Sequence, residues 1–455
     1  MKFSEKFKII QYNNLYYLFD IITLKIYINK SDDFQEFLRI SGNTRFRKKT
    51  FLKENQIKEI DNYLANQSCD AGINRAFGDF TSISSIVLNL TNQCTLACTY
   101  CSAYDFTENE DISFPVIKNA IDFLVQNNPQ SSQYGVVFFG GEPLLKAGLI
   151  ENTIRYIGEK YPQKKFFYST TTNGTVLNAR TVSLLKKNNF LVNVSLDGNK
   201  ASHDKNRKYH NGNGSFDDIL KNLKTLKINN VGFEFKVTFD SENRNLIDSF
   251  IFLENLEKPF SYSFTINSKY KSSSLTNYNK DKVESINRQF DKIYDYYYEK
   301  IVNNKKIYCV NIINSLSKIH NRIGKNYICT SGKNTITVNR DGSVFSCQNL
   351  VNYPETSIGS VMSDFSPINH AKFQALDVDF LNECMKCWLR YLCSGGCYAE
   401  KYIENKSIKK TIPLKCKMIE NYWLHIIRFY LKITSRKDIN IDHFLATSEN
   451  IKIHV

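Results

Sequence analysis

The sequence predicts an α/β protein built on a partial (β/α)6 barrel of the TIM type. Between residues 84 and 305, six short apolar runs rich in Val, Ile, Phe and Tyr alternate with stretches of helical periodicity. Such alternation favours right-handed βαβ units around a parallel sheet, and six strands are too few to close an eight-stranded barrel. A small β-then-α segment precedes this core, and a cysteine-rich segment follows it.

Composition excludes several classes of protein. The 455-residue chain is 42% hydrophobic and 13% aromatic, which is too apolar for a disordered chain. It has no apolar run of about 20 residues and begins without a signal-peptide core, so we expect a cytoplasmic protein with no membrane partner. The net charge of +15 fits an acidic peptide or an anionic cofactor, or only a Lys-rich composition. No nucleic-acid motif accompanies it, so no nucleic-acid partner is expected.

Residues 1–80 are predicted to form a small domain of strands followed by helices. The runs FKIIQY, YYLFDI and LKIYIN favour short strands, with a turn at Asn13 and Asn14. The stretches DDFQEFLRI and ENQIKEIDNYL place apolar residues at helical spacing. We predict a winged-helix-like unit here. The alternative is a simple stabilising extension of the barrel.

Residues 84–305 supply the barrel elements in strict alternation. The predicted strands are SSIVLNL, GVVFFGG, KKFFYST, FLVNVSLDG, GFEFKVTF and FSYSFTI. The predicted helices between them are FPVIKNAIDFLVQ, LIENTIRYIGEK, ARTVSLLKK, SFDDILKNLKTL and NLIDSFIFLENL. A longer helix is expected over residues 281–305, with one apolar face. That face would contain Val283, Ile286, Phe290, Ile293, Tyr297 and Ile301.

The C-terminal third divides into a cysteine-rich part, residues 306–420, and a tail, residues 421–455. The run TITVNRDGSVFSC predicts a hairpin with its turn at Asn339 to Gly342. The stretch ENYWLHIIRFYLKI favours an amphipathic helix. Twelve cysteines in a chain without an export signal indicate metal ligands or catalytic thiols rather than disulfides.

The first cysteine group directly follows the first predicted barrel strand. In LTNQCTLACTYCSAY, the thiols of Cys94, Cys98 and Cys101 form a CxxxCxxC loop. Three thiolates can each bind one iron of a cubane cluster and leave the fourth iron open to an external ligand. A structural zinc site would need a fourth protein ligand, and none lies nearby in sequence. A zinc site and a redox-sensing group are the alternatives.

This loop, at the end of the first strand of a six-fold βα array, resembles that of the radical SAM superfamily. The resemblance implies that the open iron binds S-adenosylmethionine (SAM), and that an electron from the cluster cleaves it to a 5′-deoxyadenosyl radical. It also implies a flavodoxin-type or ferredoxin-type electron donor. A non-catalytic iron–sulfur carrier is the alternative from another class of protein.

Further positions match the superfamily at the ends of later strands. Gly140, Gly141 and Glu142 resemble its GGEP motif, which implies contact with the amino group of SAM. Two glycines allow close backbone approach, and a carboxylate accepts hydrogen bonds from an ammonium. By resemblance, Asn173 lies at a family position, and Ser195 and Arg207 contact the ribose or carboxylate of SAM. The alternative for Arg207 is a surface cation. We interpret His203 and His210 as structural or solvent-facing.

The second cysteine group has the spacing of a SPASM domain. Cys329-x12-Gly342-x4-Cys347 is followed by a CxxC pair and three further cysteines, and this pattern resembles domains that carry two auxiliary 4Fe–4S clusters, making three clusters in the chain. Two zinc knuckles are the alternative. The resemblance assigns one auxiliary cluster to Cys384, Cys387, Cys393 and Cys416.

The other auxiliary cluster is assigned by resemblance to Cys329, Cys347 and Cys397, with Cys309 as the candidate for a fourth ligand. Without Cys309 this cluster would have an open iron, where a substrate thiolate would fit. Cys69 is interpreted as an ordinary buried thiol.

Enzymes with a SPASM domain mostly modify peptides, so the resemblance implies a precursor peptide with a leader sequence as the partner. Residues 1–80 resemble a RiPP recognition element, which binds a leader as an added strand. The expected reaction is an intrapeptide cross-link, with a Cys thioether first, as in sactipeptide and ranthipeptide synthases. Carbon–carbon or ether links and sulfatase maturation are the alternatives. In sulfatase-maturing relatives an aspartate base follows the second SPASM cysteine, whereas Gln348 stands here.

Overall fold

The computed structural model describes residues 7–13, 15–28, 82–101, 110–242, 245–265, 278–363 and 376–448. The two helices predicted within residues 1–80, and Cys69, lie outside these ranges. Among the described residues, no helix is both long and apolar enough to cross a membrane.

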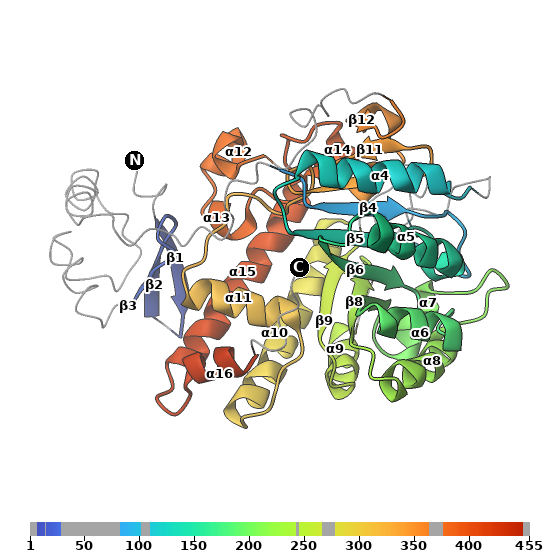
Figure 1. Cartoon of the computed structure of the whole chain (residues 1–455). Coiled ribbons are helices and arrows are strands. Elements are labelled where there is room, and N and C mark those ends of the chain that lie inside the picture. The colour runs from blue at the N-terminus through green and yellow to red at the C-terminus, as the bar shows by residue number, and fades with distance from the viewer. Residues whose placement is uncertain are drawn as a thin grey trace.

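A six-stranded parallel sheet forms the centre of the molecule (Figure 1). Neighbouring strands pair in chain order, so each βα unit places the next strand beside the last. The strands are β4 (Ser85–Asn89), β5 (Gln133–Phe139), β6 (Lys165–Thr172), β7 (Leu191–Ser195), β8 (Phe233–Phe239) and β9 (Phe260–Phe264). These are the six predicted strands, and the prediction of an α/β fold with a parallel sheet is confirmed.

Helices follow the strands and cover the outer side of the sheet. They are α4 (Phe114–Asn127), α5 (Ala147–Lys160), α6 (Ala179–Lys187), α7 (Lys200–Asn206), α8 (Phe216–Ile228) and α9 (Leu246–Asn255), with a 3-10 turn η1 (Pro143–Lys146) before α5. Local sequence explains where they begin. Pro115 lies in the first turn of α4, and Asn178 and Thr181 form a reciprocal capping box on α6.

Strands from the cysteine-rich segment extend the same sheet beyond β4. Strand β10 (Thr335–Val338) pairs in parallel with β4, and β11 (Ser343–Phe345) and β12 (Gly359–Ser360) follow antiparallel. The predicted hairpin is present as β10 and β11, and Gly342 adopts φ +84° in its turn, where a side chain would be strained. The sheet therefore contains strands from both the predicted barrel, residues 84–305, and the predicted cysteine-rich segment, residues 306–420.

The long helices of the C-terminal half pack together between the barrel and the N-terminal strands (Figure 1). They are α10 (Lys280–Val302), α11 (Val310–His320), α15 (Pro413–Thr434) and α16 (Ile441–Ser448). All six apolar residues predicted on one face of α10 are buried, as that helical periodicity requires. The short elements of the cysteine-rich segment are η2 (Gln348–Leu350), η3 (Pro354–Thr356), η4 (Val378–Phe380), α12 (Asn382–Met385), α13 (Arg390–Cys393) and α14 (Tyr398–Asn405).

The N-terminal strands form a separate antiparallel sheet that docks on the C-terminal part of the chain. Its strands are β1 (Phe7–Tyr12), β2 (Leu15–Asp20) and β3 (Ile26–Ile28), in that order. Phe19 packs edge-on against Trp388 with ring centroids 5.9 Å apart, and Lys8 lies 5.1 Å from the same ring and 3.6 Å from Glu420. These contacts join the small sheet to Trp388, which follows Cys387, and to Glu420, about one helical turn after Cys416.

Candidate active site at the carboxyl ends of the strands

The loop after β4 carries Cys94, Cys98 and Cys101 to one wall of a cavity of about 900 Å³. Cys98 is buried, and the other two are partly exposed. Burial raises the pKa of Cys98 to about 12, and the positive charge of Arg207 opposes this shift. The donor set and its position fit the predicted iron–sulfur site.

The end of β5 lies directly against the backbone of this cysteine loop. The Gly141 N–H donates to the Thr91 carbonyl at 2.7 Å, and the Glu142 N–H donates to the Gln93 carbonyl at 2.8 Å. A Cβ atom on Gly140 would lie 2.4 Å from the Thr91 oxygen. Gly140 and Gly141 both line the cavity, so the two glycines allow the close approach that the motif predicts.

The carboxylate of Glu142 is turned into the protein and is fully buried. Its Oε1 accepts from the Thr172 hydroxyl at 2.9 Å and the Leu144 N–H at 3.0 Å, and its Oε2 accepts from the Asn173 N–H at 2.7 Å. Burial raises the pKa of Glu142 to about 7 against these hydrogen bonds. In this structure the side chain joins the ends of β5 and β6, and it is the glycine backbone of the motif that lines the cavity.

Asn173, at the end of β6, holds the cysteine loop. Its Nδ2 lies 3.4 Å from the Cys94 sulfur and 3.0 Å from the Thr95 hydroxyl oxygen, while its Oδ1 accepts from the Thr175 N–H. The side chain also lines the cavity. Asn173, which the resemblance places at a family position, therefore lies beside the cysteine loop, and its side-chain amide contacts Cys94 and Thr95.

Ser195 and Arg207 both line the cavity, as the resemblance requires, and both are buried. Arg207 is therefore no surface cation: its Nε donates to the Asp197 carboxylate at 2.8 Å. Tyr100, between two cysteines of the loop, donates to the same carboxylate, and the guanidinium lies 5.5 Å from its ring. Asp197 thus fixes both a cation and the cysteine loop at the end of β7.

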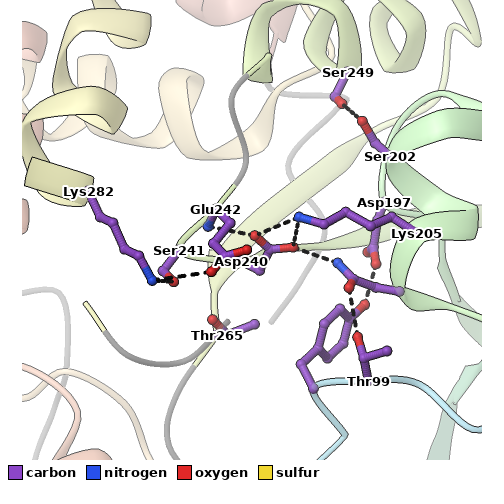
Figure 2. A network of polar contacts seen from close by, with 12 residues as sticks. Thr99, Asp197, Ser202, Lys205, Asp240, Ser241, Glu242, Ser249, Thr265 and Lys282 are labelled. Atoms are coloured by element: carbon purple, nitrogen blue, oxygen red, sulfur yellow. Dashed lines mark hydrogen bonds and ion pairs between the residues drawn. The ribbon is translucent and has the colours of Figure 1, made fainter. Parts of the chain in front are cut away.

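A second buried carboxylate anchors the same loop through α7 (Figure 2). Asp240 follows β8 and accepts from Asn206 at 2.6 Å and from Lys205 at 3.1 Å. Asn206 in turn accepts from the Thr99 hydroxyl at 2.7 Å. The motifs did not identify Asp240 or Asn206. The signal available was a charged residue immediately after a barrel strand, where functional groups gather.

His203 is buried on α7, as its structural interpretation requires. Its Nδ1 accepts from the Asp197 N–H at 3.2 Å, and its Nε2 lies 3.0 Å from the Ser215 hydroxyl. His210 is exposed, and its Nε2 lies 3.0 Å from the Cys94 carbonyl oxygen. Neither histidine is among the residues that line the cavity.

The buried ring of His203 predicts a specific acid sensitivity. Burial lowers its pKa from 6.5 to about 4, so the unfolded chain binds a proton that the folded chain does not. Above pH 6.5 the ring is neutral in both the folded and the unfolded chain. As the pH falls from 6.5 towards 4, the free energy of unfolding decreases by about 3 kcal/mol in all. We expect His203→Gln to reduce this loss in urea unfolding measured from pH 7 to 4.5. The exposed His443→Gln should not, and equal slopes for all three proteins would contradict the assignment.

Five cysteines of the C-terminal segment line a second cavity of about 220 Å³. Four of them, Cys384, Cys387, Cys393 and Cys416, are the set that the resemblance assigns to one auxiliary cluster, and the fifth is Cys397. A water molecule occupies about 30 Å³ of liquid, so the space suits a group of several atoms. Gly395 and Gly396 lie in the same wall with positive φ, which lets the backbone turn sharply between Cys393 and Cys397. Thiols around one such space fit a cluster of this kind.

Cys329, Cys347 and Cys397 lie near one another, since each influences the ionisation of its neighbours and of Tyr398. The structure leaves Cys309 apart from them. Its thiol is buried beside the Tyr297 ring and the Glu254 carboxylate, and its backbone N–H donates to Glu254 at 3.1 Å. The assignment of Cys309 as a fourth ligand stays a prediction.

Within the described residues, no three His, Cys, Asp or Glu side chains converge closely enough to bind a single metal ion. A mononuclear zinc site needs four ligands at about 2.0 to 2.3 Å from one point. The cysteine groups border the two cavities.

Comparison with known proteins identifies the central part of the chain. Residues 88–245 match the model of the Radical SAM superfamily. This part of the protein is a radical SAM domain. It contains the cysteine loop, both glycines and Arg207.

Relatives of the radical SAM domain differ in their activities. The chain is 35% identical over 174 residues to a cysteine-type anaerobic sulfatase-maturating enzyme of Clostridium novyi, covering 37% of this chain and 46% of that one. It is 26% identical over 406 residues to the radical SAM cyclopropyl synthase TigE of Paramaledivibacter caminithermalis, covering 82% and 81%. The chain spans about half the length of the first curated relatives that it matches.

Solved structures share the fold over most of the chain. The anSMEcpe protein with bound AdoMet superposes with a TM-score of 0.67 at 21% identity, over 81% of this chain and 99% of that one. Streptococcus suis SuiB bound to its precursor peptide SuiA superposes with a TM-score of 0.51 at 15% identity, over 89% and 97%. At these identities the likeness establishes the fold.

The residues of the radical SAM domain fit the two groups that the superfamily implies. Cys94, Cys98 and Cys101 would hold the 4Fe–4S cluster, and the Gly140–Gly141 backbone, Ser195 and Arg207 would line the SAM site. When bound, these groups would supply one electron and the capacity to abstract a hydrogen atom from a substrate. The protein positions the cysteine loop through Asn173 and Asp197, and holds a cation where a carboxylate can bind.

Proposed function

We propose that this protein modifies a ribosomally made precursor peptide by forming an intrapeptide cross-link, with a Cys thioether as the first candidate. The observation that carries the proposal is one continuous cavity of about 900 Å³. It extends from Cys98 and Arg207 in the radical SAM domain to Cys393 and Cys397 in the C-terminal segment. A peptide side chain in this cavity lies between the site of hydrogen abstraction and a group suited to accept an electron.

The lining of this cavity supports a peptide substrate. Among the described residues, the asparagines that line it are Asn173, Asn287, Asn311, Asn314, Asn349 and Asn421. The amides of Asn173 and Asn311 already donate and accept hydrogen bonds within the protein. The other four carry primary amides, which donate and accept as the peptide main chain does. Apolar walls from Phe264, Phe290 and Trp423 would bury side chains between the polar contacts.

Three 4Fe–4S clusters are part of the proposal. After hydrogen abstraction a substrate radical must lose one electron to become a closed-shell cross-linked product, and a cluster near the cavity is a suitable acceptor. Cys384, Cys387, Cys393 and Cys416 would hold one auxiliary cluster. Cys329, Cys347 and Cys397 would hold the other, with an iron left for a substrate thiolate or another external ligand.

The N-terminal sheet is the candidate site for the leader of the peptide. Within the described residues, β3 pairs with β2 and with no further strand, so its outer edge is available for an added strand. The sheet rests against α15 and Trp388, which places a leader-binding edge on the same side as the cysteine-rich segment.

Sulfatase maturation is the second candidate, favoured by the 35% identity to the Clostridium novyi enzyme. Its base would have to be replaced, because Gln348 follows Cys347 and an amide cannot accept a proton at neutral pH. The proposed cross-linking reaction does not require an aspartate at position 348.

One co-expression experiment separates the candidates. We expect the anaerobically purified protein to release 5′-deoxyadenosine from SAM after reduction with dithionite, and a short Cys-containing peptide encoded beside it to lose about two hydrogen atoms per cross-link. Modification should fall sharply when the leader of the peptide is removed. Mass spectrometry of the peptide and of a co-expressed sulfatase gives the reading. Conversion of the sulfatase residue with an unchanged peptide would overturn the cross-linking proposal.

A further inference from the structure

A lysine of α14 lies in the wall of the second cavity, which the cysteines assigned to one auxiliary cluster also line. Helix α14 begins directly after Cys397, and the Lys401 N–H near its start donates to the Cys397 carbonyl at 3.1 Å. Only 4% of the surface of Lys401 is exposed. The fold therefore carries a buried cationic side chain to the same space as the thiols.

The charge of Lys401 acts on three of the four thiols assigned to that cluster. Burial raises the pKa of each of these thiols, and the positive charge of Lys401 opposes the shift. They are Cys384, Cys393 and Cys416. The ammonium is therefore close enough to the thiols to stabilise negative charge placed among them.

Other charged side chains in this wall have contacts of their own. The Glu400 carboxylate lies 2.9 Å from the Lys415 ammonium, and the Glu383 carboxylate accepts from the Thr411 N–H at 3.0 Å. Among the described residues, no ion pair joins the Lys401 ammonium to a carboxylate. A buried ammonium in this position is stabilised by an anionic group in the cavity beside it.

We propose that Lys401 raises the reduction potential of the auxiliary cluster assigned to this cavity. A cluster gains one negative charge when it accepts one electron, and a fixed positive charge nearby stabilises the reduced form more than the oxidised form. The inference rests on the proposed function, because it assigns a residue to the electron acceptor of that reaction.

The proposed cross-link leaves one electron for this acceptor. The peptide thiol releases its proton to solvent, and the thiolate forms a carbon–sulfur bond with the carbon radical that hydrogen abstraction leaves. One electron remains, so the substrate is oxidised by one electron and the cluster is reduced by one. A higher cluster potential favours this transfer.

The competing explanation is that Lys401 only fills the wall of the cavity with its apolar stem. The two roles predict different measurements. A lysine that only packs can be replaced by an uncharged side chain of similar length without a change in potential. A lysine that acts through its charge can be replaced only by another cation.

The test measures cluster potentials in the anaerobically reconstituted protein, by redox titration monitored with electron paramagnetic resonance. SAM is added to a parallel sample, because it changes the signal of the cluster that it binds and so separates that signal from the auxiliary ones. We expect Lys401→Gln to raise the ratio of oxidised to reduced cluster about tenfold at the wild-type midpoint of one auxiliary signal. For a one-electron couple this is a shift of about 59 mV to lower potential.

Three further variants separate charge from packing. Lys401→Arg keeps the charge and should hold that ratio within about twofold of the wild type. Lys401→Met keeps an apolar stem without the charge and should reproduce the shift of the Gln variant. Lys409→Gln, which removes an exposed lysine between α14 and α15, should leave both auxiliary signals unchanged. Iron content and circular dichroism are measured on each protein.

Unchanged auxiliary potentials in the Gln and Met variants would overturn the inference and leave the proposed function in place. An equal shift in the Arg variant, or loss of iron from both neutral variants, would overturn it in favour of packing. A wild-type protein with about four rather than about twelve iron atoms would remove the auxiliary clusters and the inference together. Release of 5′-deoxyadenosine is measured in the same samples. Its absence would remove the proposed function, while a shift that depends on the charge at position 401 would still be observed.

Discussion

Replacing Cys98 with Ser is expected to abolish SAM cleavage by this protein. Cys98 is the buried member of the three-cysteine loop, with 7% of its surface exposed, and it lines the cavity beside Arg207. A serine hydroxyl is a poor ligand for iron, and two thiolates cannot retain a cubane that needs three. We expect 5′-deoxyadenosine release to fall by about a thousandfold or more, and iron to fall by about four of the roughly twelve atoms per chain that three proposed clusters would hold.

Cys309→Ser is the matched control for this experiment. Cys309 is also buried, but it lies beside Tyr297 and Glu254, apart from the cysteines that border the cavities. We expect its iron content and SAM cleavage to equal those of the wild type. Loss of iron from the Cys309 variant would restore this residue as a fourth auxiliary ligand. Full iron content in the Cys98 variant would contradict the assignment of the first site.

Gly141→Ala is expected to reduce SAM cleavage strongly, although Gly141 is not one of the cysteines proposed to bind the cluster. A Cβ at position 141 would lie 2.3 Å from the Gln93 carbonyl oxygen and 2.8 Å from that of Asn92. These atoms are backbone, immediately before Cys94, and hydrogen bonds from Gly141 and Glu142 hold the two segments together. The loop must therefore shift, and overpacking of this kind costs about 1 to 3 kcal/mol. We expect SAM cleavage to fall by about a hundredfold.

Gly158→Ala provides the control for the size of the substitution. Gly158 lies within α5, and a Cβ there would meet no atom within 4 Å. Alanine in a helix interior is favoured over glycine by about 0.5 to 1 kcal/mol, so this variant should be at least as stable as the wild type. Thermal unfolding and 5′-deoxyadenosine release measured on both variants check the pair. An active Gly141 variant with a wild-type melting temperature would show that the loop accommodates the methyl group at no cost.

Local sequence patterns predicted the barrel elements because these patterns report neighbours that are close along the chain. Strands β4 to β9 and helix α10 have the residues expected from their periodicity. The turn between β10 and β11 was predictable from Asp341–Gly342 alone, since the turn chemistry is local. The cysteine spacing likewise predicted which thiols would share a loop.

Contacts between distant segments were not predictable in this way. The motif predicts contact between Glu142 and SAM, but it does not predict that the carboxylate accepts hydrogen bonds from residues at the end of β6. Asp240 belongs to no motif, yet it anchors the cysteine loop through Asn206. In each case the partner is a buried donor brought close by the parallel sheet, and a buried carboxylate must be satisfied by whatever donors surround it.

Local sequence patterns alone predict the order of strands and helices, the thiols of the first loop and the spacing of the later cysteines. They can do so because propensity, periodicity and motif spacing act over short stretches of chain. The tertiary structure decided which thiols share a cavity, that Cys309 stands apart, and that Lys401 lies in the wall of the second cavity. Those outcomes depend on how a nine-stranded sheet and the helices α10, α11 and α15 pack together, and packing joins residues that no local pattern relates.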